Sequence, residues 1–510
     1  MHRSLGRRVF VGAVGAIAAA ALATPAYAAA PVIDVALPDV TVAAGGKTEI
    51  GPLLSSDKET TVLGAKAVYE LSAGLEGVSF EAPEESSDCT SDGPTKFTCT
   101  ANFETWISPD GVIGDFEAGI AATEAALGKS GTVKLTFSAD GVAPITRTAE
   151  LTVAEGVDLA AGGDKEISGK PGASFDASLQ VRNNTDKVVR GAAVLFYTDY
   201  PFQSTKQFSN CFYSQGQVNA CTFDRDLEPG ASYQIVLPYK LRADTYAPGV
   251  VAGEFEWFTT GDYTDLIKFL DDNGYEGPGT AGDGGKLELR KLPAAASLGN
   301  HKQTDTTPTN NSQTLTVNAS GKQGTDFAAI GANVSGGAGD TVKVPVGVRN
   351  NGPASLDRSR HGGPAVVAVV TIPAGTKVAT VPAGCFKAED DSVRTKPDAL
   401  QYVCFSNPVF PVKTQVVWEF GLKITKVVPN AAGAIELNPA CECDVFSRDI
   451  NKSNDVAKIV VNPTDDGGSG GGLPVTGPQT GLIGAGGALL VAAGIAGFIV
   501  ARRRRTRFEA

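Results

Sequence analysis

The sequence predicts a mainly β protein in which tandem β-sandwich domains lie between an N-terminal export signal and a C-terminal membrane helix. Short stretches alternate apolar and polar residues with a period of two, which is typical of half-buried strands. Glycine (60) and proline (29) are frequent and favour short strands and turns over long helices. Eight cysteines lie in the central, exported part, where disulfides are permitted.

A signal peptide is expected at residues 1–28. Three arginines fall within the first eight residues, and 9–23 is an uncharged apolar run that is short for a membrane span. An A-x-A sequence follows, and the expected cleavage signal and mature start are Ala26, Ala28 and Ala29. The pair Arg7-Arg8 also fits a twin-arginine signal, so the export route stays open.

A membrane-spanning helix is expected at 482–501. These 20 residues carry no charge, and at 1.5 Å per residue they span about one hydrocarbon core. The tail 502–510 is basic, which places it in the cytoplasm and the bulk of the chain outside. The arginines expected to stop transfer are Arg502, Arg503, Arg504 and Arg505.

A short motif precedes this span, after a glycine-rich tether at 464–472. The pentapeptide 473–477 consists of Leu473, Pro474, Val475, Thr476 and Gly477. Together with the span and the arginines, it resembles the LPXTG cell-wall sorting signal of Gram-positive surface proteins. The alanine- and glycine-rich ends look like those of actinobacteria.

The resemblance implies a covalent anchoring reaction. A sortase cleaves between Thr476 and Gly477 and joins the threonine to an amine of peptidoglycan. Sortase and peptidoglycan are then the expected partners, and the chain is the substrate of this chemistry. A plain single-pass membrane anchor is the alternative.

The cysteines predict one local disulfide in each third of the chain. Cys89–Cys99 and Cys211–Cys221 are pairs ten residues apart, and Cys385–Cys404 is a pair nineteen apart. The pair Cys441–Cys443 is ambiguous, since these residues could bond to each other, pair elsewhere or act in redox chemistry.

The central region also repeats itself. Residues 172–184 align with 339–351, and both stretches end in Arg-Asn-Asn and alternate apolar residues. Three β-sandwich domains are therefore expected, resembling the immunoglobulin-like repeats of bacterial surface proteins. The expected bounds of the domains are 32–155, 156–292 and 325–463. A polar linker is expected at 293–324, before the third domain. The three domains are expected to form an extended rod, with a hinge at this linker that lets the third domain move freely. Short helices are expected at 116–127 and 263–270.

No pattern for catalysis or metal binding stands out. Acidic loops near Glu81 and at 389–391 lack the alternating spacing of a calcium loop, and His361 lies in a glycine-rich loop. The three tryptophans, one per domain, are expected in the cores. The net charge of −12, with both ends basic, leaves an acidic middle that disfavours nucleic acid.

The function expected from the sequence is a secreted, peptidoglycan-anchored surface protein that acts as a non-catalytic stalk, wall component or adhesin. No cofactor is expected, and an extracellular glycan or protein is a possible ligand. The alternative is a wall-displayed carbohydrate-active or other hydrolase, which needs two carboxylates across a cleft.

Overall fold

The computed structural model describes residues 32–82, 89–109, 111–112, 116–292, 303–388, 400–439 and 449–464. Several expected features lie outside these ranges. They are the signal peptide, nearly all of the tether, the sorting motif 473–477, the span 482–501, the terminal arginines, and Cys441 and Cys443. In the described ranges no helix has the length and apolar character needed to cross a bilayer.

Unit one, the first of three β units, contains strands β1 to β13. Their bounds are β1 (Ile33–Ala36), β2 (Val40–Ala43), β3 (Lys47–Ile50), β4 (Leu53–Ser56), β5 (Thr60–Val62), β6 (Lys66–Leu71), β7 (Val78–Glu81), β8 (Cys89–Ser91), β9 (Lys96–Thr100), β10 (Thr105–Ile107), β11 (Ala118–Ala122), β12 (Ser130–Ala139) and β13 (Val142–Val157). One sheet has the order β3-β11-β7 and the other β2-β13-β12-β6-β9-β8.

Unit two contains β14 to β26 and the α-helix α1. The bounds are β14 (Leu159–Ala161), β15 (Lys165–Gly169), β16 (Ser174–Asn183), β17 (Ala192–Thr198), β18 (Phe202–Ser204), β19 (Cys211–Ser214), β20 (Gln217–Phe223), β21 (Ser232–Leu241), β22 (Ala247–Phe258), α1 (Thr260–Asp272), β23 (Thr280–Ala281), β24 (Arg290–Lys291), β25 (Gln303–Asp305) and β26 (Ser312–Gln323). Its sheets are β14-β16-β21-β18 and β15-β26-β22-β17-β20-β19-β23.

Unit three contains β27 to β38. The bounds are β27 (Phe327–Ile330), β28 (Ala332–Val334), β29 (Thr341–Asn350), β30 (Leu356–Asp357), β31 (Val367–Thr371), β32 (Thr376–Thr380), β33 (Cys385–Lys387), β34 (Gln401–Phe405), β35 (Val409–Phe410), β36 (Gln415–Ile424), β37 (Ala431–Leu437) and β38 (Val456–Val461). Its main sheets are β27-β29-β36-β32 and β28-β38-β37-β31-β34-β33.

The units repeat one topology. In each, an early strand pairs parallel with the last strand of the unit: β2 with β13, β15 with β26, and β28 with β38. Each unit also has its own apolar core, and the inward positions of β16 and β29 alternate as the sequence predicts. The expected disulfides Cys89–Cys99, Cys211–Cys221 and Cys385–Cys404 are present, and each joins directly opposed residues of a hairpin in the larger sheet.

The expected linker at 293–324 is wrong over its described part, which begins with β25 at Gln303. Residues 312–323 form β26, which lies between β15 and β22 in the larger sheet of unit two. Leu315 and Val317 are buried in the core, while the residues that alternate with them, Thr314, Thr316 and Asn318, are polar. Because half of its residues are polar, the segment has a low average hydrophobicity and resembles a linker, although the strand is central in the sheet. Unit two therefore closes only at β26, well beyond the expected boundary at 292.

One of the two expected helices is present. Helix α1 is capped by Thr259, whose side chain accepts the N–H of Asp262, and it packs on an apolar outer face of β17, β20 and β22. The stretch 116–127 instead contributes strand β11 and a single 3₁₀ turn, Glu124–Ala126. A few apolar residues at short spacing fit both the helical and the strand period. Here the stretch forms a strand because it pairs with β3 and β7.

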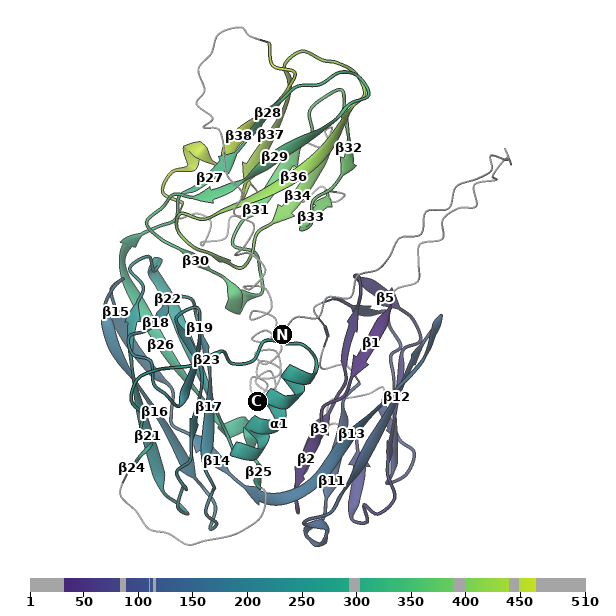
Figure 1. Ribbon diagram of the computed structural model, residues 1–510, viewed down its shortest axis with the longest axis vertical. Coiled ribbons are helices and arrows are strands. Elements are labelled where there is room, and N and C mark those ends of the chain that lie inside the picture. Colours follow the sequence, from purple (N-terminus) through teal and green to yellow (C-terminus); the bar gives the residue numbers. More distant parts are fainter. Residues whose placement is uncertain are drawn as a thin grey trace, which may run out of the picture.

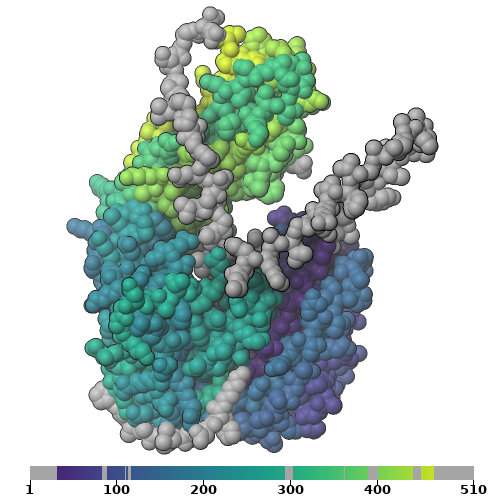
Figure 2. All heavy atoms as spheres, viewed as in Figure 1, coloured from purple at the N-terminus to yellow at the C-terminus, as the bar shows by residue number. Residues whose placement is uncertain are grey.

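The three units form a continuous body and not an extended rod. Figure 1 shows units one and two side by side with α1 between them, and unit three at one end of unit two. The space-filling view shows the green and yellow unit three seated on the teal unit two (Figure 2). Strand β13 runs from unit one to the start of unit two and also pairs with β25.

We predict that β26 contributes to the stability of unit two. Replacing the buried Leu315 by alanine should lower the free energy of unfolding by about 2–5 kcal/mol, because it leaves a cavity in the core. Chemical denaturation of the full-length protein measures this change. The exposed Ser320, also in β26, provides the control: Ser320→Ala should stay close to wild type. Equal effects of both variants would contradict the structural role of the strand.

Candidate functional site

The residues singled out from the sequence do not gather into one site. Glu81 pairs with Lys47 at the surface, and Asp92 accepts a hydrogen bond from Thr98. In the part of the chain that the structure describes, no group of three or more histidine, cysteine or acidic residues is placed to hold a metal ion. The tryptophan expectation is partly wrong, because Trp257 and Trp418 are buried but Trp106 is 52% exposed.

The polar groups that do converge lie where one unit joins the next. At the entry to unit two, the carboxylate of Asp305 accepts the N–H of Leu159 at 2.8 Å and that of Thr307 at 2.7 Å. The side chain of Asn310 donates to Asp158 at 3.0 Å. We call Asp158, Asp305 and Asn310 the clasp of unit two. It ties the segment before β26 to the chain arriving from unit one.

The same clasp recurs in unit three. The carboxylate of Asp449 accepts the N–H of Phe327 at 2.7 Å and that of Asn451 at 2.9 Å, and Asn454 donates to Asp326 at 2.8 Å. We call Asp326, Asp449 and Asn454 the clasp of unit three. A main-chain bond accompanies each clasp, from Thr306 to Val157 and from Ile450 to Thr325.

Sequence reasoning missed both clasps, although a signal was present. Residues 305–311 read Asp-Thr-Thr-Pro-Thr-Asn-Asn, and 449–455 read Asp-Ile-Asn-Lys-Ser-Asn-Asp. Aspartate leads each stretch and asparagine stands five residues later. In each, a short 3₁₀ turn, Pro308–Asn310 or Lys452–Asn454, places the asparagine side chain. Treating 293–324 as a linker hid this similarity.

Further contacts fix unit one against unit two. Gln303 is buried, donates to Glu155 at 3.0 Å and to the carbonyl of Val188 at 2.7 Å, and accepts the N–H of Arg190. Helix α1 reaches unit one through Lys268, which pairs with Asp39 at 3.1 Å. The helix therefore braces the joint as well as covering its own sheet.

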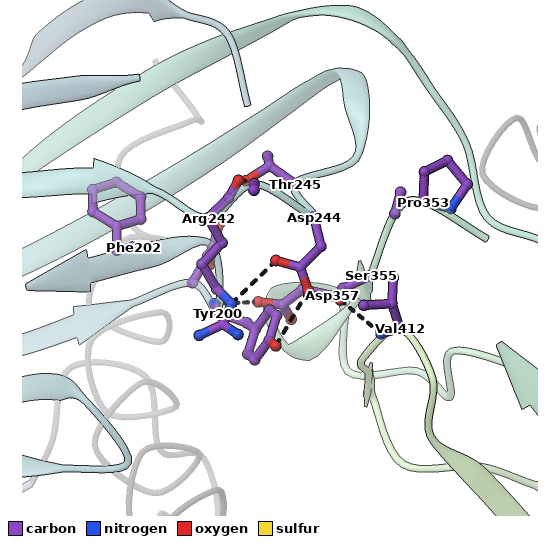
Figure 3. A network of polar contacts seen from close by, with 12 residues as sticks. Tyr200, Phe202, Arg242, Asp244, Thr245, Pro353, Ser355, Asp357 and Val412 are labelled. Atoms are coloured by element: carbon purple, nitrogen blue, oxygen red, sulfur yellow. Dashed lines mark hydrogen bonds and ion pairs between the residues drawn. The ribbon is translucent and has the colours of Figure 1, made fainter. Parts of the chain in front are cut away.

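A polar network joins unit two to unit three (Figure 3). Asp357 of β30 accepts the N–H of Tyr200 at 2.7 Å, and Ser355 donates its hydroxyl to Asp244. The N–H of Ser355 also donates to the carbonyl of Asp244 at 2.7 Å. Arg242 lies over the ring of Tyr200 at 4.3 Å, within the range of a cation–π contact.

Arg360 contacts three groups of unit two at this joint. Its guanidinium group pairs with the carboxylate of Asp199 and donates to the carbonyls of Tyr197 at 2.7 Å and Ala252 at 2.9 Å. Arg360 comes from the loop at 357–364, which the repeat alignment identifies as an insertion in the third unit. The insertion could be found from the sequence, but its docking partners in unit two could not.

Burial sets the electrostatics of this ion pair. Desolvation raises the pKa of Asp199 to about 6, with a smaller contribution from the nearby Asp357, while Arg360 and the N–H of Ala252 act in the opposite direction. Asp305 in the clasp of unit two behaves similarly, since burial raises its pKa to about 6 against the effect of its hydrogen bonds. The joints thus contain carboxylates with unusually high pKa values.

A small cavity lies beside the start of α1. Its volume is about 240 Å³, and its lining includes Arg190, Asp224, Asp226, Thr260 and Tyr263. This is below the roughly 300–1,000 Å³ typical of small-molecule pockets. The cavity carries no chemistry that we can assign.

No protein-family model matches the chain. No curated protein matches it either.

Solved structures align only weakly with this chain. A type I cohesin–dockerin complex from Clostridium thermocellum gives 13% identity over 27% of this chain and 99% of that chain, with a TM-score of 0.18. A cohesin from Clostridium acetobutylicum gives 17% identity over 28% and 92%, with a TM-score of 0.19. An I-band fragment of titin gives 7% identity over 86% and 99%, with a TM-score of 0.15. All three scores are below 0.5, so the β-sandwich assignment rests on the strand pairing of the chain itself.

We predict that Arg360 holds unit three in its orientation. Arg360→Ala removes contacts to three acceptors of unit two and should broaden the distribution of unit two–unit three arrangements without unfolding either core. Small-angle scattering of the full-length protein should then show a larger maximum dimension. Lys377→Ala, at an exposed position of unit three, is the matched control. Identical scattering from both variants would contradict the role of Arg360 in holding unit three.

The raised pKa of Asp199 predicts a pH dependence with a definite sign. Its pKa is about 6 in the folded state and near 3.8 when unfolded, so its contribution to stability is complete below about 3.8 and is lost as pH rises through about 6. The loss is about 3 kcal/mol at most. The free energy of unfolding should therefore fall between pH 5 and pH 7.5, and Asp199→Asn should flatten this slope. A variant slope as steep as wild type would contradict the assignment.

Proposed function

We propose that this protein is an exported surface stalk that a sortase links covalently to peptidoglycan. The observation that carries this proposal is the succession of three features at the C-terminal end of the sequence. They are the pentapeptide 473–477, the apolar span 482–501 and the arginine-rich end. The span and arginines hold the chain in the membrane until cleavage between Thr476 and Gly477. Pro474 favours an extended conformation at Leu473, which suits binding in a protease-like groove.

The ectodomain fits a non-catalytic role. Three disulfide-bonded β units in series suit an oxidising, extracellular location. Contacts such as Gln303 with Glu155 and Arg360 with Asp199 connect successive units, so the stalk presents unit one, the farthest from the tether along the chain, in a set orientation. Such a support could carry a glycan- or protein-binding surface. A hydrolase remains the second hypothesis from the sequence, and no observation in the described residues favours it.

Anchoring can be tested at the proposed cleavage site. Thr476→Ala should prevent covalent linkage, because the sortase reaction takes place at the threonine carbonyl. The variant should then be extracted from cells by boiling detergent, whereas wild type should require digestion of the cell wall. Val475→Ala changes the free position of the motif and should anchor normally. Thr476→Ala protein that stays in the wall after detergent would refute the proposal.

A further inference from the structure

The clasps of units two and three differ at the residue that follows their asparagine. This residue is Asn311 in unit two and Asp455 in unit three. The two occupy equivalent places, because the carbonyl of Asn311 accepts the N–H of Trp257 at 3.0 Å and that of Asp455 accepts the N–H of Leu437 at 2.9 Å. Trp257 and Leu437 are themselves equivalent positions of β22 and β37. The repeat thus provides a natural comparison between an amide and a carboxyl group.

Asn311 supplies hydrogen-bond donors at this position. Its side chain is buried, and its Nδ2 group donates to the carbonyl of Trp257 at 3.0 Å. The same amide lowers the pKa of Asp305 by hydrogen bonding, so it also faces the clasp carboxylate. The amide therefore links the end of β22 to the clasp of unit two, and it does so in its only protonation state.

Asp455 has no hydrogen to donate when it is ionised. A carboxylate is an acceptor only, and Oδ1 of Asp455 is buried with no hydrogen-bond partner among the described residues. The negative charges of Asp449 and Asp326 face it, opposed by Lys452. Burial, followed by the charge of Asp449, raises its pKa to about 6. A proton on this carboxyl group would supply the missing donor and remove the repulsion.

We propose that the clasp of unit three is a proton-operated switch with Asp455 as its titrating group. When Asp455 is protonated, its carboxyl group takes the role of the Asn311 amide and the clasp holds the chain entering unit three. When Asp455 is ionised, a buried oxygen lacks a donor and three carboxylates repel one another, so the clasp loosens.

The raised pKa of Asp455 determines whether acid strengthens or weakens the clasp. The folded-state pKa of Asp455 is about 6, and its ordinary value is 3.8. Its stabilising contribution is therefore complete below about 3.8 and is lost as pH rises through about 6. Unit three should be held most firmly in acid and less firmly at neutral pH. The inference concerns the ectodomain and does not depend on anchoring.

The test exchanges the two residues in the full-length protein. Hydrogen exchange, corrected for the intrinsic effect of pH, would report protection of the Phe327 and Asn451 amides in unit three and of Leu159 and Thr307 in unit two. Between pH 5 and pH 7.5, wild-type protection in unit three should fall about tenfold more than in Asp455→Asn, since one pKa unit corresponds to a factor of ten and Asp455 is half-exposed. Asp305 and Asp449 remain in both proteins, so the difference isolates Asp455.

The reciprocal variant Asn311→Asp should introduce the same extra pH dependence in unit two. If this variant does not fold, the comparison of wild type with Asp455→Asn still tests the proposal. Equal pH dependence in wild type and Asp455→Asn would overturn the proposal. So would a restoration of wild-type protection by millimolar calcium at pH 7.5 that Asp455→Asn does not show, because the carboxylates would then form a cation site.

Discussion

The arrangement of the units depends on one recurring interaction: in units two and three, an aspartate before the last strand accepts a main-chain N–H from the chain that enters the same unit. Asp305 and Asp449 each bond one N–H of the entering strand and one of their own loop. Without these bonds, the first strand of each unit would start with unsatisfied donors at a buried junction. The segments that carry these aspartates run directly into the last strands, β26 and β38. In units two and three, the segment that leads into the last strand therefore also holds the chain that enters the unit.

The acidic surface opposes close packing of one unit on another. A chain with net charge −12 and basic ends concentrates negative charge on its β units, and such surfaces repel one another. Together with the expected polar linker at 293–324, this repulsion favoured a mobile third unit. The structure overcomes the repulsion locally, by placing Arg360 and Lys268 opposite Asp199 and Asp39 of neighbouring units. A few well-placed cations thus outweigh a general repulsion that salt would screen.

Much of the architecture could be predicted, and the failures have a shared cause. Alternation with period two identified β16 and β29, and the cysteine spacing identified the three hairpin disulfides. The same alternation in β26 was overlooked because its outward residues are threonine and asparagine, which resemble linker composition. The joints were not predictable, since Asp199 and Arg360 are far apart in sequence and carry no local pattern. The clasps were visible only as a repeat of Asp and Asn at fixed spacing.

The joints also bear on how raised pKa values are interpreted. Buried carboxylates with a high pKa often mark catalytic sites, because a general acid needs a proton near neutral pH. In this chain the pKa values of Asp199, Asp305 and Asp455 are all raised to about 6. Asp199 makes an ionic contact and Asp305 a main-chain contact, and Asp455 is affected by the charge of the clasp residue Asp449. Asp199 and Asp305 lie at different joints, and Asp455 opposes another clasp carboxylate at the entry to unit three. A raised carboxyl pKa in this chain is thus accounted for by burial at a joint or beside a clasp, without invoking a catalytic role.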